Sequence, residues 1–239
     1  MTDIYPLSLV TGTRDRPDCF RRLLLSIVRH TSVPFELIVS DASSAPYDIP
    51  LRPANIVWLP EHPRLGMVKG YNRAFEAATG KWVIWLNDDC EVLPGYDTAA
   101  IDFMEANPQI GLGALYYSEE GVQGGKFHVN TFLEMLYANF GILRRSLGKE
   151  LGWFDEELTM YGSDNSLTFK TLLAGHGVTS IPGAKVIHHG HVDQQRRENM
   201  AGQRIDGKKL VKKYYHKIPD MRPIYRTNRS VGGPLELSA

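Results

Sequence analysis

The chain has 239 residues, of which 43% are hydrophobic and 23% charged, a composition typical of a soluble globular protein with one domain. Basic and acidic residues both number 27, so the formal net charge is zero, which argues against a uniformly basic nucleic-acid-binding protein. The two cysteines, Cys19 and Cys90, form no C-x-x-C pair, which disfavours a structural zinc site and favours a reduced, intracellular protein.

The N-terminal residues Met1–Leu9 lack the basic region and the long apolar run of a signal peptide. No apolar stretch reaches the roughly 20 residues that a membrane-spanning helix needs. We therefore expect a cytoplasmic protein, either free or attached peripherally to a membrane.

The first half of the chain alternates β-rich runs with amphipathic helical segments. The predicted strands are Leu7–Thr11, Phe35–Ser40, Asn55–Leu59 and Trp82–Leu86. The predicted helices are Cys19–His30, which follows Pro17, and Val68–Ala78, which ends before Gly80. This order predicts right-handed crossovers and a mostly parallel sheet, in which ligands bind beyond the carboxyl ends of the strands.

Polar side chains follow three of these strands. Thr11 and Arg14 lie at the end of the first strand, Asp41 follows the second, and Asp88 and Asp89 follow the fourth. Because the carboxyl ends of parallel strands share one edge of the sheet, we expect these residues to gather there. The pattern therefore predicts a polar binding site at this edge.

The second half of the chain is less regular. Its predicted features, in chain order, are a Gly-rich loop at Ser118–Lys126, an apolar segment at Phe132–Leu143 that crosses beneath the site, a helix at Leu167–Leu173, a strand at Lys185–Ile187, a basic helix at Lys208–Lys217 and a loosely packed tail at Arg226–Ala239.

The acidic run Asn87-Asp88-Asp89-Cys90-Glu91 offers hard oxygen ligands that suit Mg²⁺ or Mn²⁺. A cation held there would bridge a diphosphate and stabilise the charge that develops on it. A solvated turn or a helix N-cap explains two adjacent Asp residues as well, so the local sequence alone leaves both interpretations open.

Two further segments contain candidate site residues. Asp164 precedes an apolar helix, where a carboxylate serves either as a general base on a hydroxyl or as an N-cap. His188, His189 and His191 follow the last predicted strand, and an imidazole there is a candidate ligand for a metal or a phosphate. Their spacing matches no zinc motif.

Three basic residues are candidate partners for a diphosphate. Arg64, Lys69 and Arg73 precede the acidic turn, and Arg and Lys pair well with phosphate oxygens. For each residue taken singly, a solvated helix face is the simpler interpretation.

Six segments in this order resemble glycosyltransferase family 2, the inverting enzymes with a type-A glycosyltransferase fold. They are Thr11–Pro17 with Leu23–Ile27, Leu37–Ser44, Leu65–Ala74 with Ala78–Gly80, Leu86–Gly95, Gly152–Asp164 and Ile181–His188. The resemblance covers most of the chain, from Leu7 to His191. It implies an α/β fold with a single type-A glycosyltransferase domain, built on a Rossmann-like, mostly parallel central sheet with flanking helices.

The resemblance also implies roles for individual residues. Asp164 matches the catalytic base, Asp89 the principal metal ligand, and His188 a second contact to the metal or the diphosphate. Together with the charge arguments above, it gives as donor-binding residues Thr11, Arg14, Asp41, Arg64, Lys69, Asn72 and Asp88. Two positions depart from the family pattern: Asn87 replaces the first acid of the D-x-D element, and Ser163 replaces the Glu that usually precedes the catalytic Asp.

The predicted function is metal-dependent, inverting transfer of a sugar from a nucleoside-diphosphate sugar, with Mn²⁺ or Mg²⁺ as cofactor. The acceptor is a hydroxyl of a glycan, a lipid-linked glycan or another compound. Asn87 and Ser163 motivate an alternative, a sugar-nucleotide-binding protein of the same fold with weak or no transfer activity. A nucleotidyltransferase is disfavoured, because its phosphate loop is rich in Gly and Thr11–Arg14 contains only one.

Residues 1–207 are expected to form the catalytic domain, with a nucleotide-sugar-binding half at 1–100 and an acceptor half at 101–207. Residues 208–239 then form a C-terminal basic helix and tail. Lys208–Tyr215 is either a surface that contacts a membrane or an anionic acceptor, or a packed helix with Leu210, Val211 and Tyr214 inward. We favour the packed helix, because Lys stems commonly cover apolar surface.

Overall fold

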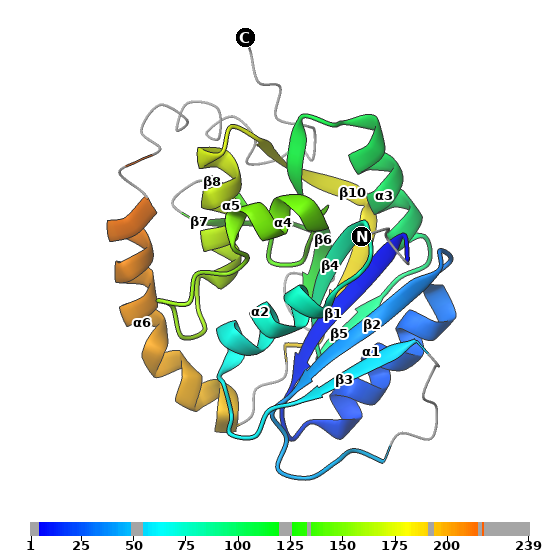
Figure 1. The fold of residues 1–239 in the computed structure, drawn as a ribbon, viewed down its shortest axis with the longest axis vertical. Coiled ribbons are helices and arrows are strands. Elements are labelled where there is room, and N and C mark those ends of the chain that lie inside the picture. The colour runs from blue at the N-terminus through cyan, green and yellow to red at the C-terminus, as the bar shows by residue number, and fades with distance from the viewer. Residues whose placement is uncertain are drawn as a thin grey trace.

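A computed structural model describes residues 5–48, 55–119, 126–132, 135–190, 194–214 and 217 (Figure 1). The strands are β1 (Leu7–Thr13), β2 (Phe35–Asp41), β3 (Ile56–Pro60), β4 (Trp82–Asn87), β5 (Cys90–Val92), β6 (Ile110–Glu119), β7 (Asn130–Phe132), β8 (Met135–Tyr137), β9 (Gly141–Arg144) and β10 (Gly177–His188). The helices are α1 (Pro17–His30), α2 (Met67–Ala77), α3 (Tyr96–Ala106), α4 (Arg145–Leu151), α5 (Ser163–Leu173) and α6 (Gln194–Tyr214). Most of the predicted loop Ser118–Lys126, together with His191 and the predicted tail, lies outside the described residues.

An eight-stranded sheet forms the centre of the molecule, in the order β3-β2-β1-β4-β9-β6-β10-β5. β1 pairs in parallel with β2 and β4, β2 pairs in parallel with β3, and β6 pairs in parallel with β10. β9 and β5 run antiparallel to their neighbours. The predicted fold class, an α/β domain with a mostly parallel sheet, is confirmed, and the parallel strands end together at one edge.

Helices cover both faces of this sheet (Figure 1). α1 and α3 pack on one face, where Phe20 and Met104 belong to the same apolar cluster. α2 and α5 pack on the other face around Phe75. Leu210 and Tyr214 of α6 join this second cluster, so the C-terminal helix shares the core of the domain.

A close contact between the backbone of β9 and the Trp85 side chain helps to fix the register of β9 against β4. Gly141 of β9 is the register partner of Trp85 of β4. A Cβ at position 141 would lie 2.4 Å from the Trp85 ring, so only glycine fits there without displacing the indole. The Trp85 Nε1 then donates to the carbonyl of Asn139 at 3.1 Å, which ties the start of β9 to the sheet.

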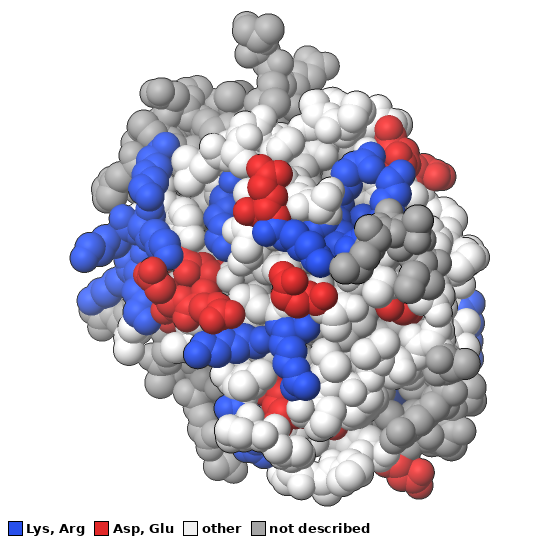
Figure 2. Space-filling view, viewed as in Figure 1, with Lys and Arg blue, Asp and Glu red and all other residues white. Residues whose placement is uncertain are grey.

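α6 differs most from its prediction, because it begins at Gln194 rather than at Lys208. The expected boundary between residues 207 and 208 therefore falls inside a helix. Leu210 is 1% exposed and Tyr214 is 5% exposed, which supports the packed-helix alternative, whereas Val211 is only half-buried. Figure 2 shows basic and acidic side chains side by side on the flank that α6 occupies in Figure 1. Among the helices that the structure describes, none has the length and apolar character to cross a bilayer.

Two other predicted elements change. The apolar segment Phe132–Leu143 is divided between the small β7–β8 hairpin and β9, and it forms no single crossing segment. β10 begins at Gly177 rather than at Lys185, because a register shift after Ile181 lets the strand continue past Pro182. Proline is tolerated in a strand at such irregularities, so the Pro-Gly pair does not end β10.

Candidate functional site

A cavity of about 800 Å³ opens at the carboxyl edge of the sheet. Its lining comes from the ends of β1, β2, β4 and β10, the segment between β3 and α2, the β7–β8 hairpin, the loop before α5, and α6. The edge predicted from the strand order is therefore the edge that contains the cavity.

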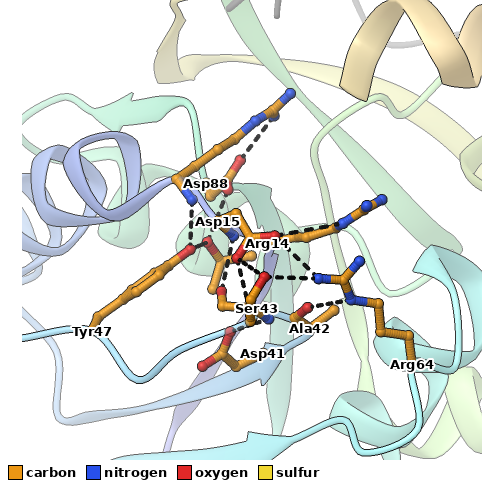
Figure 3. Close-up of polar contacts among 11 residues, drawn as sticks. Arg14, Asp15, Asp41, Ala42, Ser43, Tyr47, Arg64 and Asp88 are labelled. Atoms are coloured by element: carbon orange, nitrogen blue, oxygen red, sulfur yellow. Dashed lines mark hydrogen bonds and ion pairs between the residues drawn. The ribbon is translucent and has the colours of Figure 1, made fainter. Parts of the chain in front are cut away.

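One side of the cavity is formed by a network around Asp15 (Figure 3). Arg64 belongs to this network: its Nε donates to the Ala42 carbonyl at 2.8 Å, and its Nη2 pairs with Asp15 Oδ2 at 3.1 Å. The Ser44 N–H donates to Asp15 at 2.7 Å, and this hydrogen bond, helped by Arg64, lowers the pKa of the Asp15 carboxyl. Arg14 lines the same side, with its Nε 3.9 Å from Asp15. Two guanidinium groups thus border this part of the cavity.

Asp41 and Thr11 lie beside the cavity and do not line it. Asp41 is buried and accepts from the Ser43 N–H and the Trp58 Nε1–H, both at 2.9 Å. Thr11 is fully buried within β1, because this strand continues to Thr13. The structure therefore does not place Thr11 on the cavity wall, and Thr13 takes the edge position.

Asp88 is held by the first strand and the first helix. Its Oδ2 accepts from the Thr13 hydroxyl at 2.9 Å, and Arg16 Nη1 lies 3.5 Å from its Oδ1. The side chain is buried, and this burial, with the neighbouring Asp89 carboxylate, raises the pKa of Asp88 to about 6. Asp88 therefore connects the acidic turn to β1 and α1 while lining the cavity.

Asp89 meets His188 across the sheet edge. Asp89 Oδ1 lies 3.3 Å from His188 Nε2, and both side chains are more than nine-tenths buried. The pairing of β5 with β10 brings them together, because His188 is the register partner of Cys90. The backbone adds a second link, since the His189 N–H donates to the Asp89 carbonyl at 2.9 Å.

The chemistry of this pair fits a divalent cation. Two ligands of an octahedral ion, each at about 2.1 Å, lie about 3 Å apart, close to the observed separation. Within the part of the chain that is described, no group of three His, Cys, Asp or Glu side chains surrounds a single point. Two protein ligands with open positions suit Mg²⁺ or Mn²⁺ bound together with phosphate oxygens and water.

Asp164 lies in the first turn of α5 and lines the cavity. The N-cap of α5 is Gly162, in a left-handed conformation, so Asp164 is not the capping residue. Its Oδ1 accepts from the Asn165 N–H at 3.0 Å. Desolvation by the surrounding protein raises the pKa of the half-buried Asp164 carboxyl to about 7, which is near the value that suits a general base.

Two further predicted donor-binding residues, Lys69 and Asn72, do not line the cavity. Lys69 is exposed on α2 and does not line it. Asn72 joins α2 to the segment after α4: its Nδ2 donates to the Phe154 carbonyl at 3.0 Å, and its Oδ1 accepts from the Phe154 N–H at 3.0 Å. Asn72 thus connects α2 to Phe154 by hydrogen bonds, and neither Asn72 nor Lys69 lines the cavity. Arg73 likewise donates to the Pro60 carbonyl, at 2.7 Å.

The cavity also contains residues that sequence reasoning missed. Thr13 and Arg16, which contact Asp88, follow the predicted first strand, and extending that strand by two residues would have found Thr13. Glu61 is 4% exposed, lines the cavity, and accepts from the Ser40 hydroxyl at 2.7 Å and the Leu65 N–H at 2.9 Å. No local pattern marks Glu61 as a site residue.

Comparison with known proteins gives one family. The model of glycosyl transferase family 2 matches residues 8–173. The O-antigen biosynthesis protein RfbC of Myxococcus xanthus is 27% identical in an alignment that covers 77% of this chain and 17% of that protein. The chain therefore spans about one sixth of the length of this relative.

Solved structures share the fold. GalNAc-T7 with UDP, GalNAc and Mn²⁺ superposes with a TM-score of 0.72 at 13% identity, over 92% of this chain and 50% of that one. The mannosyltransferase PcManGT from Pyrobaculum calidifontis, in complex with GDP-Man and Mn²⁺, gives 0.68 at 16% identity, over 94% and 69%. S. aureus TarS 1-349 gives 0.64 at 16%, over 96% and 71%. These likenesses show that the domain has the type-A fold of these enzymes.

Proposed function

The chain belongs to glycosyltransferase family 2, and from this premise we propose that it transfers a sugar from a nucleoside-diphosphate sugar to an acceptor hydroxyl, using a divalent cation and inverting the anomeric carbon. Membership makes the chain a glycosyltransferase. The donor, the metal and the stereochemistry are the proposal.

The observation that carries the proposal is the meeting of three side chains at one cavity. Asp89 comes from the turn after β4, His188 from the end of β10, and Asp164 from the start of α5, and all three line it. Asp89 and His188 are suited to hold a cation, and Asp164 is suited to act as a general base. Sugar transfer from a diphosphate needs both a cation and a base.

The donor fits the side of the cavity that Arg14 and Arg64 border. Guanidinium groups pair well with phosphate oxygens, and Asp15 holds Arg64 in place. Mn²⁺ or Mg²⁺, when bound by Asp89 and His188, supplies positive charge beside the departing diphosphate. The GalNAc-T7 and PcManGT structures contain UDP and GDP-Man, each with Mn²⁺, which supports a donor and a metal of these kinds.

Asp164 acts as the base in this proposal. Its carboxylate takes the proton of the acceptor hydroxyl, and the hydroxyl oxygen bonds to the anomeric carbon on the face opposite the diphosphate. The bond from that carbon to the diphosphate oxygen breaks, and the configuration inverts. A carboxyl with a pKa of about 7 is largely ionised just above neutral pH and is still basic enough to accept the proton.

The positions of these residues in the sequence agree in part with the expected donor half at 1–100 and acceptor half at 101–207. Residues 1–100 supply Arg14, Arg64, Asp88 and Asp89, while the later part supplies Asp164 and the hairpin and helix beside it. His188 is the exception, because it comes from the second half and meets the metal carboxylate of the first. The two halves are therefore proposed as donor and acceptor sides that share the metal site.

The test is release of nucleoside diphosphate from a panel of UDP and GDP sugars, with Mn²⁺ and with EDTA. We expect turnover that EDTA abolishes and that Asp164→Asn reduces strongly. Full turnover in EDTA would contradict the proposed requirement for a metal ion. Full turnover in Asp164→Asn would contradict the proposed role of Asp164 as the base. Calorimetric binding of a sugar nucleotide with no product would instead favour a sugar-nucleotide-binding protein without transfer activity.

A further inference from the structure

The loop before α5 is held by a buried carboxylate of α6. Asp206 is 0% exposed. Its Oδ2 accepts from the N–H groups of Thr159, Met160 and Tyr161 at 3.1, 3.0 and 3.2 Å and from the Thr159 hydroxyl at 2.8 Å. Its Oδ1 accepts again from the Thr159 N–H, at 3.2 Å. Successive backbone N–H groups that converge on one carboxylate form an anion-binding turn, here filled by the protein's own side chain.

Asp206 belongs to a row of α6 residues that contacts the same loop region. Residues four apart lie on one face of a helix, and Asp206, Leu210 and Tyr214 have this spacing. A Cβ on Gly162 would lie 3.3 Å from Leu210, so this leucine packs directly on the N-cap of α5. The Tyr214 hydroxyl donates to Asp155 Oδ2 at 2.7 Å. The row thus contacts both ends and the middle of the segment 155–162.

Asp155 adds a charged link between α6 and this segment. Lys213 Nζ lies 2.8 Å from Asp155 Oδ2 and 2.9 Å from Glu157 Oε1. Hydrogen bonds from Lys213 and Tyr214 lower the pKa of Asp155 against the effect of its burial. The segment is therefore attached to α6 at Asp155 and again at Thr159–Tyr161.

The fixed loop leads directly to the proposed base. Tyr161 is followed by Gly162, Ser163 and Asp164, and the Ser163 hydroxyl donates back to the Met160 carbonyl at 3.1 Å. Thr159, Met160 and Tyr161 line the cavity, and so do Gln203 and Gly207 on the neighbouring turns of α6. A displacement of the loop would move Asp164 relative to Asp89 and His188.

We propose that Asp206 is a positioning residue for the sugar transfer: it fixes the Thr159–Tyr161 loop, and through it Asp164, while α6 forms one wall of the acceptor subsite. This inference rests on the proposed function. It assigns to α6 a role in the reaction, in addition to its role in the core. A misplacement of about 1 Å at a catalytic group can reduce a rate by about 100-fold. Loss of the hydrogen bonds between Asp206 and the loop is therefore expected to lower kcat.

The test compares Asp206→Asn with Glu36→Gln, a matched control. Glu36 is also a buried carboxylate that accepts loop N–H groups, from Thr79 at 2.6 Å and Gly80 at 3.2 Å, but at the opposite edge of the sheet. Both variants lose charge and backbone hydrogen bonds, so both are expected to lower Tm. Only Asp206→Asn is expected to reduce kcat for nucleoside diphosphate release, by about 10- to 100-fold, with KM for the donor within about twofold.

Hydrogen–deuterium exchange by mass spectrometry supplies a readout that needs no turnover. We expect Asp206→Asn to speed exchange in residues 159–166, and Glu36→Gln to speed it near residues 79–80. Thr159→Val, which removes only the hydroxyl bond to Asp206, is expected to give a smaller change of the same kind and serves if Asp206→Asn does not fold.

The outcomes separate the two proposals. Unchanged exchange at residues 159–166, wild-type kcat in Asp206→Asn, or an equal loss of kcat in Glu36→Gln would overturn the role of Asp206. Absence of donor turnover in the wild type counts against the proposed function, while the exchange data still decide whether Asp206 holds the loop.

Discussion

Asp89 Oδ1 and His188 Nε2 lie 3.3 Å apart, although one residue follows the fourth strand and the other ends the tenth. The contact depends on β5, which follows the acidic turn and pairs with β10. The proposed metal site is therefore assembled by tertiary structure from two distant parts of the chain.

The first prediction concerns that pair. Asp89→Ala or His188→Ala is expected to weaken Mn²⁺ binding in the presence of UDP or GDP by at least about 100-fold, because each removes one of two protein ligands. Calorimetric titration measures the affinity. Glu91→Gln is the control, since Glu91 lies two residues further along the chain in β5 and contacts His189, and Mn²⁺ affinity should change little. Equal weakening in all three variants would contradict a site centred on Asp89 and His188.

The second prediction concerns Asp164 as the base. Asp164→Asn is expected to lower kcat by about 10²- to 10⁴-fold, the usual contribution of general base catalysis. The wild-type rate should fall as pH drops below about 7, because protonation of a carboxyl with that pKa removes the base. A pH–kcat profile checks both points, and a flat profile between about pH 5 and 8 would exclude Asp164 from this role.

The third prediction concerns the stability cost of Asp164. Its folded pKa of about 7 exceeds the ordinary value of 3.8, so between these pH values the folded state binds more protons than the unfolded state. The free energy of unfolding of the wild type should then decline as pH rises from about 4 to 7, by up to about 4 kcal/mol. Asp164→Asn lacks this titration and should exceed the wild-type Tm above about pH 7 and approach it near pH 4. Parallel Tm curves for the two proteins would refute it.

The fourth prediction compares two basic residues that precede the acidic turn. Arg64→Ala is expected to weaken nucleotide binding by about 10- to 100-fold, the value of a charge-assisted hydrogen bond, because Arg64 borders the donor side of the cavity. Lys69→Ala should stay within about twofold of the wild type, because Lys69 lies outside the cavity. Calorimetry with UDP and GDP, each with Mn²⁺, measures both, and equal effects would disprove this placement of the donor.

The fifth prediction tests the packing behind the site. A Cβ on Gly148 would lie 2.0 Å from the Trp153 ring, which is buried and stacked on Phe75 with ring centroids 4.7 Å apart. Gly148→Ala is expected to reduce the free energy of unfolding by about 1 to 3 kcal/mol, because the ring has no room to move.

The control for this change is Gly207→Ala in α6. Among the described atoms, none outside the local helix backbone lies within 4 Å of a Cβ at this position. Alanine there should stabilise the protein by about 1 kcal/mol, because it favours the helical backbone more than glycine does. Urea unfolding measures both variants, and a stable Gly148→Ala would mean that the packing around Trp153 is looser than described.

The strand order was enough to predict the cavity edge and the meeting of Arg14, Asp88 and Asp89 there. The position of His188 beside Asp89 was predicted from the family resemblance, because nothing in the local sequence shows that β5 pairs with β10. Thr11 was misplaced by the length of β1, since a shift of two residues along a strand keeps the face but moves the side chain away from the edge.

Asn72 and α6 depart from the sequence-based expectation for a different reason, which is that their contacts join residues far apart in the chain. Asn72 lies in a segment that resembles the family, yet its amide is used by Phe154, a contact between residues far apart in the chain. The start of α6 was missed because its first turns are rich in polar residues and give no apolar period. Among its described contacts, the buried carboxylate of Asp206 has no sequence signature.

The acidic turn is connected at each end to a different part of the same sheet. β4 lies fourth in the strand order and β5 lies last, and only Asp88 and Asp89 separate them in the chain. A hinge motion of one half of the domain against the other would therefore displace Asp88 and Asp89, which link the two strands. The arrangement therefore disfavours a clamshell opening of the sheet, because such a motion would change the positions of the two carboxylates at the proposed metal site.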